Sequence, residues 1–338
     1  MNRLILREKY GKIKCDGTYS VAFWGLSMNT VRIKSYAKIN FTLEIVGEKD
    51  GYHLLDSLVS TIDLYNYIVL KKRKNGLSSV TMHGQGSESI PPECNNALKA
   101  AERFSERFGV NGADITVYKN IPIGAGLGGS SADISGVLRG MAKLYNITDK
   151  QAVETLALEL GSDTAYMLQG GFMRMQGRGE RLYPLPIKER LHLLLLCPQT
   201  GVSVGKCFAE YDKNPTPLPK TNTENCIKLW TNGDINDGGR YLTNDLFRPA
   251  ATLCDDVRAA YESLTSFSPL GVTMTGSGSC VFAWFESKEL CEWAKSRYKG
   301  KARAIVTHTL NPEYDKDKKP LFRNPFALSK EEIENAEK

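Results

Sequence analysis

The sequence has few of the residues and patterns that mark metal centres, membrane spans or nucleic-acid surfaces. Its 338 residues include four histidines and eight cysteines. No two cysteines form a C-x-x-C pair, so we expect no zinc site. The longest apolar runs, such as 191–197, are too short to cross a bilayer. The net charge of +6 is modest, and no dense basic stretch carries interleaved aromatics, which argues against a nucleic-acid partner.

The isolated cysteines also indicate a compartment. A chain of this length can form its core without disulfides, so we expect free thiols in a reducing, cytoplasmic setting. No apolar segment followed by a cleavage site begins the sequence, and we read no signal peptide. Met28 offers an alternative start, which makes residues 1–27 a poorly ordered extension. We expect a monomer or homodimer that binds a small-molecule substrate and neither nucleic acid nor membrane.

The order of predicted elements indicates two domains. The composition shifts to proline and charge over 184–190, where we place the domain boundary. The predicted units are an N-terminal domain at 28–186, a C-terminal domain at 187–311 and a charged tail at 312–338. Strands and helices alternate in a segregated order, which predicts an α+β fold.

Local patterns predict the elements within these domains. Alternating apolar and polar residues predict strands over 31–46, broken near 35–37, and two more strands after a turn at Asp50 and Gly51. We expect Thr148 to cap a helix that stops at Gly161. Further strands are predicted at 113–118, 172–175, 181–183, 191–197, 271–273, 281–285 and 302–309, and further helices at 95–108, 204–211, 223–231, 255–264 and 288–298.

The most informative stretch is Pro122–Leu144, PIGAGLGGSSADISGVLRGMAKL. Four glycines and an alanine fall within six residues and lead into a helical pattern. Such a loop leaves backbone N–H groups uncovered at a helix N-terminus, where they bind phosphate. Ser130, Ser131 and Asp133 are expected to cap the helix, and a serine hydroxyl could reach a nucleotide-bound Mg²⁺. The alternative is an ordinary glycine-rich turn with a serine cap.

Two other nucleotide-binding patterns fit less well. Gly124, Gly126 and Gly129 satisfy G-x-G-x-x-G, the fingerprint of nicotinamide oxidoreductases. That fingerprint directly follows a buried strand and precedes an acidic residue about 20 positions on. Here 119–122 intervene, and Asp149 lies in a polar turn. No G-x-x-x-x-G-K-[ST] string occurs, so a Walker-type loop is unsupported.

Other polar residues are ambiguous on their own. Asp163 follows Gly161 either as the cap of a short helix at 164–168 or as a reactive carboxylate, with equal support. Lys38 lies in an apolar strand, where periodicity alone favours a solvent-facing side chain. Tyr52 and His53 follow a turn and, taken alone, indicate only a structural role.

The glycine-rich segment, with its Pro-x-Gly-Ala-Gly-Leu-Gly-Gly-Ser-Ser-Ala pattern, resembles the phosphate loop of the GHMP small-molecule kinases. This resemblance implies a two-domain fold, with an N-terminal domain like ribosomal protein S5 domain 2 and a ferredoxin-like C-terminal domain. It implies ATP and Mg²⁺ as cofactors, without assigning metal ligands. It assigns ATP binding to Pro122, Gly124, Ala125, Gly126, Leu127, Gly128, Gly129, Ser130 and Ser131, and to Gly276 and Gly278 in a second glycine turn.

The resemblance also implies the reacting groups. Leu160–Gly171 is similar to the element that carries the catalytic Asp of these kinases, with Thr164 and Ala165 as departures, so Asp163 becomes the expected base. Ala37–Leu43 and Asp50–His53 are similar to the 4-diphosphocytidyl-2-C-methyl-D-erythritol kinase branch. By that match Lys38 is the catalytic cation, and the residues that bind substrate are Asn40, Tyr52, His53 and Phe208.

Two further segments, 242–250 and 275–282, resemble the same branch, with departures at Phe247 and Arg248. The implied reaction is phosphorylation of the 2-hydroxyl of 4-diphosphocytidyl-2-C-methyl-D-erythritol, a step toward isoprenoid precursors. The alternative is a GHMP kinase for another small alcohol, such as mevalonate or homoserine, neither of which carries a nucleobase. A non-catalytic binding protein would have no need of Lys38 and Asp163.

Overall fold

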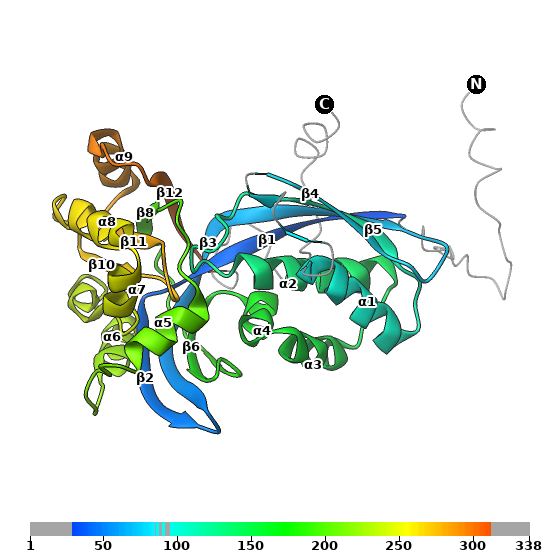
Figure 1. Ribbon diagram of the computed structural model, residues 1–338, viewed down its shortest axis with the longest axis horizontal. Coiled ribbons are helices and arrows are strands. Elements are labelled where there is room, and N and C mark those ends of the chain that lie inside the picture. Colours follow the sequence, from blue (N-terminus) through cyan, green and yellow to red (C-terminus); the bar gives the residue numbers. More distant parts are fainter. Residues whose placement is uncertain (1–28, 85, 88–89, 92–94, 312–338) are drawn as a thin grey trace, which may run out of the picture.

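The computed structural model describes residues 29–311, except 85, 88–89 and 92–94 (Figure 1). Predictions about residues 1–27, Met28 and the tail at 312–338 lie outside this part of the chain. The described strands form one sheet that runs through two lobes. The six cysteines within the described residues are buried free thiols, as predicted; Cys15 and Cys94 lie outside them.

The strand β3 (Tyr52–Lys72) organises the first lobe. Its 21 residues form a single strand, where the sequence analysis expected two. Within this lobe it pairs antiparallel with four strands, which are β1 (Thr30–Asn40), β2 (Thr42–Lys49), β5 (Ala113–Tyr118) and β6 (Phe172–Gly177). These neighbouring strands form hydrogen bonds with the backbone of β3 along its whole length. The strand therefore continues without a turn in its middle.

The predicted break near 35–37 is a shift of register inside a continuous strand. The pairing of β1 with β3 shifts between Tyr36 and Lys38, while β1 continues to Asn40. Before the shift, buried and partly exposed residues alternate; from Ala37 to Asn40 every residue is buried. The irregularity therefore ends the simple alternation of faces on which the prediction for Lys38 depended.

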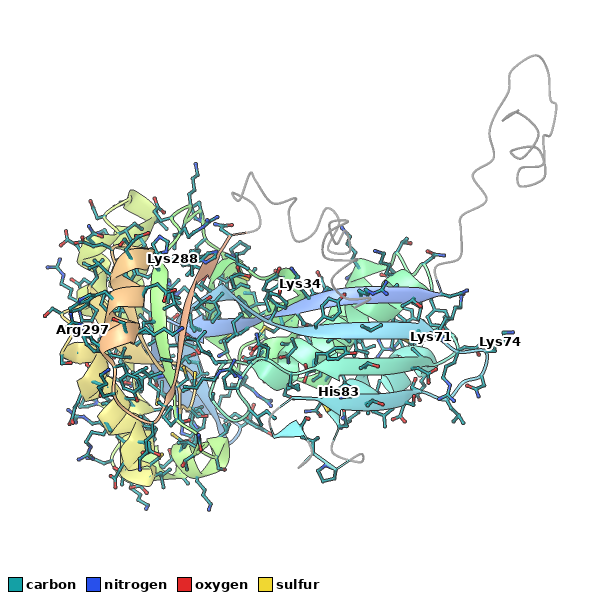
Figure 2. All side chains as sticks on the ribbon, turned by 90° about the horizontal axis from the view of Figure 1, so that it is seen from above. Lys34, Lys71, Lys74, His83, Lys288 and Arg297 are labelled. Atoms are coloured by element: carbon teal, nitrogen blue, oxygen red, sulfur yellow. The ribbon has the colours of Figure 1, made fainter. Side chains whose placement is uncertain are left out.

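Helices cover one face of this part of the sheet (Figure 1). They are α1 (Asn96–Phe108), α2 (Gly129–Leu144), α3 (Lys150–Leu160) and α4 (Ser162–Gln169). The helix predicted at 95–108 is α1, which ends at Gly109 as expected and begins after Asn95, whose side chain caps it. The predicted cap Thr148 of α3 is wrong, since the carboxylate of Asp149 accepts from the Ala152 N–H. Figure 2 looks onto the sheet from the side opposite these helices.

The second lobe contains four antiparallel strands in the order β10–β11–β8–β12. Around them lie five helices and short segments. The strands are β8 (His192–Cys197), β10 (Gly271–Met274), β11 (Val281–Phe285) and β12 (Arg303–Leu310), and the helices are α5 (Val204–Tyr211), α6 (Asn222–Asn232), α7 (Phe247–Leu253), α8 (Asp255–Thr265) and α9 (Lys288–Arg297). The end of β12 pairs with β3, which joins the lobes. The domain limits 28–186 and 187–311 stay a prediction.

Most predicted elements are present with ends shifted by one or two residues. The strand β7 (Arg181–Pro184) follows β6, as expected. The sequence analysis missed four elements: β4 (Ser79–His83), η3 (Asn236–Tyr241), β9 (Thr243–Asn244) and α7. None of the described helices has the length and apolar character of a membrane span.

Candidate active site

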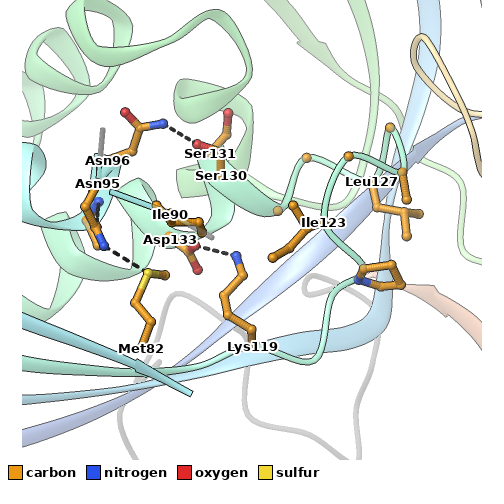
Figure 3. A pocket seen from close by; sticks show the side chains of 17 residues that line it. Met82, Ile90, Asn95, Asn96, Lys119, Ile123, Leu127, Ser130, Ser131 and Asp133 are labelled. Atoms are coloured by element: carbon orange, nitrogen blue, oxygen red, sulfur yellow. Dashed lines mark hydrogen bonds and ion pairs between the residues drawn. The ribbon is translucent and has the colours of Figure 1, made fainter. Parts of the chain in front are cut away.

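The glycine-rich loop lines a pocket of about 350 Å³ between β5 and α2 (Figure 3). The nine loop residues predicted to bind ATP all contribute to its wall. The opposite wall includes Met82 of β4 and Asn95 and Asn96 at the start of α1. The pocket is therefore bounded by the glycine-rich loop and by the N-terminus of α2. A phosphate group binds in such an arrangement.

The helix α2 begins without a side-chain cap. Its N-cap is Gly128, and no side chain bonds to its first amides among the residues described. The predicted capping roles are wrong, because Ser130 Oγ accepts from Asn96 Nδ2 at 2.5 Å and Asp133 pairs with Lys119. The first-turn N–H groups are thus left for a ligand, and the helix dipole adds positive potential there.

Close packing explains two of the loop glycines. Gly126 and Gly128 have φ values of 75° and 70°, in the left-handed region. A Cβ at Gly126 would lie 2.1 Å from the carbonyl oxygen of Thr275. A Cβ at Gly128 would lie 2.3 Å from Met167 Cε and 3.2 Å from Lys38 Cγ. The loop therefore lies directly against the stem of Lys38.

The second glycine turn supports the loop from behind. The Cys280 N–H donates to the Ala125 carbonyl at 3.1 Å, and Thr275 Oγ1 donates to the Gly126 carbonyl at 3.2 Å. Gly276 and Gly278, predicted to bind nucleotide, have positive φ and do not line the pocket. Their observed contribution is to the shape of the turn that holds the loop.

Lys38 and Asp163 meet beside the loop. Lys38 Nζ lies 3.3 Å from Asp163 Oδ2, and the two side chains are 6% and 29% exposed. The periodicity-based interpretation of Lys38 as solvent-facing is wrong, since it is buried. The alternative reading of Asp163 as a cap is also wrong, because it lies in the first turn of α4 and makes no capping bond. That position places its negative charge at the positive end of a helix.

Asn40 holds the lysine in place. Its Oδ1 accepts from Lys38 Nζ at 2.7 Å and from the Gly276 N–H at 3.0 Å, while its Nδ2 donates to Ser57 Oγ at 2.8 Å. The side chain is fully buried. The amide thus joins Lys38 to the second glycine turn.

The residues predicted to bind a base lie at the start of β3, where α5 packs against the strand. The rings of His53 and Phe208 stack with centroids 4.8 Å apart, and His53 Nε2 lies 2.7 Å from Asp212 Oδ1. Tyr52 is half exposed, and the guanidinium of Arg178 lies 3.5 Å from the centre of its ring. Phe208 therefore stacks on His53, and Tyr52 on Arg178.

One strand connects the two parts of the site. Ser57, which bonds to Asn40, lies four residues after His53 in β3. At about 3.4 Å per residue, the main chain of His53 lies about 14 Å along the strand from Ser57, which belongs to the network around Lys38. An acceptor that engages both ends must be elongated.

Comparisons with known proteins agree with this geometry. The GHMP kinases N terminal domain matches residues 95–173, and the GHMP kinases C terminal domain matches 224–299. A 4-diphosphocytidyl-2-C-methyl-D-erythritol kinase of Caldicellulosiruptor saccharolyticus is 33% identical over 82% of this chain and 96% of its own length. One from Clostridium beijerinckii is 33% identical over 83% of this chain and all of its own. The chain belongs to the GHMP kinase family.

Solved structures place the kinase in the same fold. A crystal structure of 4-(cytidine 5'-diphospho)-2C-methyl-D-erythritol kinase matches with a TM-score of 0.67 and 27% identity, over 83% of this chain and all of the other. A homoserine kinase from Cytophaga hutchinsonii has a TM-score of 0.68 but 17% identity, over 86% of this chain and 98% of its own, so it shows the fold alone. The expected two-domain GHMP kinase fold and ATP-dependent small-molecule kinase activity are confirmed.

The sequence analysis missed one charged pair of the kinase pocket. Lys119 Nζ lies 2.5 Å from Asp133 Oδ2, and both side chains are 5% exposed (Figure 3). Burial raises the pKa of Asp133, against the lowering effects of Lys119 and of the hydrogen bond from Asn66. Lys119 lies three residues before Pro122 in the sequence. This closeness to the glycine-rich loop could have identified it as a pocket residue. Asp212 and Arg178, which contact the aromatic residues, carried no comparable signal.

Proposed function

We propose that the kinase transfers the γ-phosphoryl group of ATP to the 2-hydroxyl of 4-diphosphocytidyl-2-C-methyl-D-erythritol. The observation that carries the proposal is the pair Lys38–Asp163, 3.3 Å apart, beside the glycine-rich loop. The two relatives of this name match 82% and 83% of this chain over 96% and 100% of their own lengths. The reaction belongs to the non-mevalonate route to isoprenoid precursors.

ATP fits the loop on structural grounds. The pocket joins uncapped helix amides to a wall of glycines, and this combination binds phosphate oxygens through main-chain N–H groups. We assign the nucleotide to the nine loop residues given above, with Gly276 and Gly278 acting through the loop that their turn supports. Bound ATP supplies the phosphoryl group that is transferred.

Asp163 and Lys38 then have complementary roles. In phosphoryl transfer the protein mainly positions the groups and neutralises charge, while a carboxylate accepts the proton of the attacking hydroxyl. We assign that proton to Asp163, which is partly exposed and can face an acceptor. Lys38, buried and held by Asn40, orients the carboxylate and offsets negative charge that develops at the reacting oxygens.

Within the described residues, no group of three or more histidine, cysteine or carboxylate side chains is placed to hold a metal ion. Mg²⁺ keeps several waters and binds nucleotide phosphates through one or two protein oxygens. We therefore propose that it enters on the triphosphate, with the hydroxyl of Ser130 or Ser131 beside it at the start of α2.

The cytidine end of the acceptor fits the far end of β3. Stacking on an aromatic ring contributes about 1–3 kcal/mol per base. Phe208 stacks on His53 there, and Tyr52 precedes His53 in the strand. Asn40 is placed beneath the reacting end, where its contact with Lys38 serves the acceptor indirectly. We further propose a cytoplasmic enzyme, monomeric or homodimeric, divided at residues 186 and 187.

An assay of ADP release tests the proposal. Purified full-length protein is offered ATP with the cytidine-linked acceptor, mevalonate or homoserine in separate reactions. We expect turnover with the cytidine-linked acceptor alone, and its loss in Asp163→Asn. Mevalonate and homoserine have no base that could stack on Phe208 or Tyr52. Faster turnover with either compound would therefore contradict the proposed acceptor.

A further inference from the structure

Helix α5 and the residue that ends it, Asp212, present two side chains to the imidazole of His53. Phe208 stacks on the ring at 4.8 Å. Asp212, one helical turn later, approaches its edge, with Oδ1 2.7 Å from Nε2. Residues four apart lie on the same face of a helix, so one short helix fixes both the plane and the orientation of the ring.

The contact with Asp212 determines which ring nitrogen carries the proton. An ionised carboxylate only accepts hydrogen bonds, so Nε2 is the donor. In the neutral imidazole, the other nitrogen, Nδ1, is then an acceptor. Among the residues that the structure describes, Nδ1 has no hydrogen-bond partner, and the side chain is 20% exposed.

We propose that Asp212 is a positioning residue that makes the acceptor site select cytosine over uracil. It holds His53 in the tautomer whose Nδ1 accepts a hydrogen bond from the 4-amino group of cytosine. Uracil has a carbonyl oxygen at the corresponding position, so two acceptors would face each other. The inference rests on the proposed function, because it concerns the cytidine end of that acceptor.

Asp212 is too exposed for its carboxylate to contribute much to the stability of the fold. Its side chain is 53% exposed, and ion pairs at such positions contribute little to stability. Removing the carboxylate should therefore leave the protein folded. Glu210→Ala is a matched control, because Glu210 belongs to the same helix and has the same charge but bonds to Lys213.

The tautomer can be measured directly. The chain has only four histidines, so full-length protein labelled with ¹⁵N-histidine gives few ring signals, and His53→Gln assigns the pair from His53. The spectra are recorded in alkaline solution, where they report the neutral form of the ring. We expect its proton on Nε2 in the unmodified protein and in Glu210→Ala, and a mixture of tautomers in Asp212→Ala. A ring protonated at Nδ1, or an unchanged spectrum in Asp212→Ala, would overturn the inference.

Titrations with CDP and UDP measure the consequence for selectivity. We expect the unmodified protein to bind CDP at least about 10-fold more tightly than UDP, because a mismatched buried acceptor costs about one hydrogen bond. Asp212→Ala should lose most of this preference, Asp212→Glu should recover part of it, and Glu210→Ala should keep it. A preference that survives in Asp212→Ala, or no binding of CDP, contradicts the proposal.

The two proposals fail separately. If the protein does not phosphorylate the cytidine-linked acceptor, the proposed function is wrong, while the ring spectrum and the CDP and UDP titrations still decide the role of Asp212. If turnover is normal and Asp212→Ala keeps both the tautomer and the preference for CDP, only the role of Asp212 is wrong.

Discussion

Lys38 Nζ lies 3.3 Å from Asp163 Oδ2, although the lysine belongs to β1 and the aspartate to the first turn of α4. The lysine is buried, and the carboxylate faces partly outward. A cation fixed behind a more accessible carboxylate holds that group in place and orients it toward an incoming hydroxyl. The relationship between these two residues underlies the first two predictions.

Asp163→Asn should lower kcat by about 10²–10⁴, because the amide cannot accept the hydroxyl proton. Nucleotide affinity should change little, since the loop is intact. ADP release and a nucleotide titration measure the two effects. Asp256→Asn is the control, as it also changes an exposed acid in the first turn of a helix. Unchanged turnover in Asp163→Asn would remove this residue from the role of base.

Lys38→Met should also abolish most turnover, by about 10²–10³ in kcat, the usual effect of losing one group that stabilises developing charge. Methionine has a similar length and suits a buried position, so the thermal midpoint should fall only slightly. Steady-state kinetics and a thermal melt test both statements. Near-normal kcat would mean that the buried cation serves the fold alone.

Asn40→Ala should lower kcat and stability while leaving KM for the acceptor nearly unchanged. The substitution leaves the Gly276 N–H and Ser57 Oγ without the Asn40 amide, at a cost of about 1–3 kcal/mol in free energy of unfolding. It also frees Lys38. Asn232→Ala at the exposed end of α6 is the control. A large rise in KM with normal stability would instead indicate direct contact with the acceptor.

Gly128→Ala should destabilise the protein and weaken ATP binding. A left-handed conformation costs a non-glycine residue about 1–2 kcal/mol, and the new Cβ would lie 2.3 Å from Met167 Cε. Adding Met167→Ala should relieve the contact but not the backbone strain. Gly76→Ala, where no atom lies within 4 Å, should be neutral. Equal stability and ATP affinity in both single variants would contradict the prediction.

Lys119→Met should make stability depend more strongly on pH. Burial already raises the pKa of Asp133, and Lys119 opposes that effect. Without the lysine, the folded-state pKa of Asp133 rises further above its unfolded-state value. The free energy of unfolding should therefore be highest in acid and decrease as the pH rises through the folded-state pKa. Adding Asp133→Asn should remove this dependence, and urea denaturation between pH 5 and 8 measures it.

Features that depend on neighbouring residues were predictable from the sequence. Asn95 and Gly109 mark the ends of α1 because capping and left-handed φ act within one turn. The glycines before α2 likewise predicted an uncovered helix N-terminus, and the structure has one. Local reasoning misassigned two caps. Asp149, the neighbour of Thr148, caps α3, and Ser130 bonds instead to Asn96, which is distant in the sequence.

The sequence by itself determined the end of α1 at Gly109, the glycine-rich loop before α2 and, by resemblance, the family. Only the tertiary structure decided that β3 is one strand, that Lys38 is buried and that Asp212 orients His53. These features depend on strand register and on contacts between residues far apart in the chain. Periodicity within a segment carries no information about either, because the partner that buries or bonds a side chain is fixed only when the elements assemble.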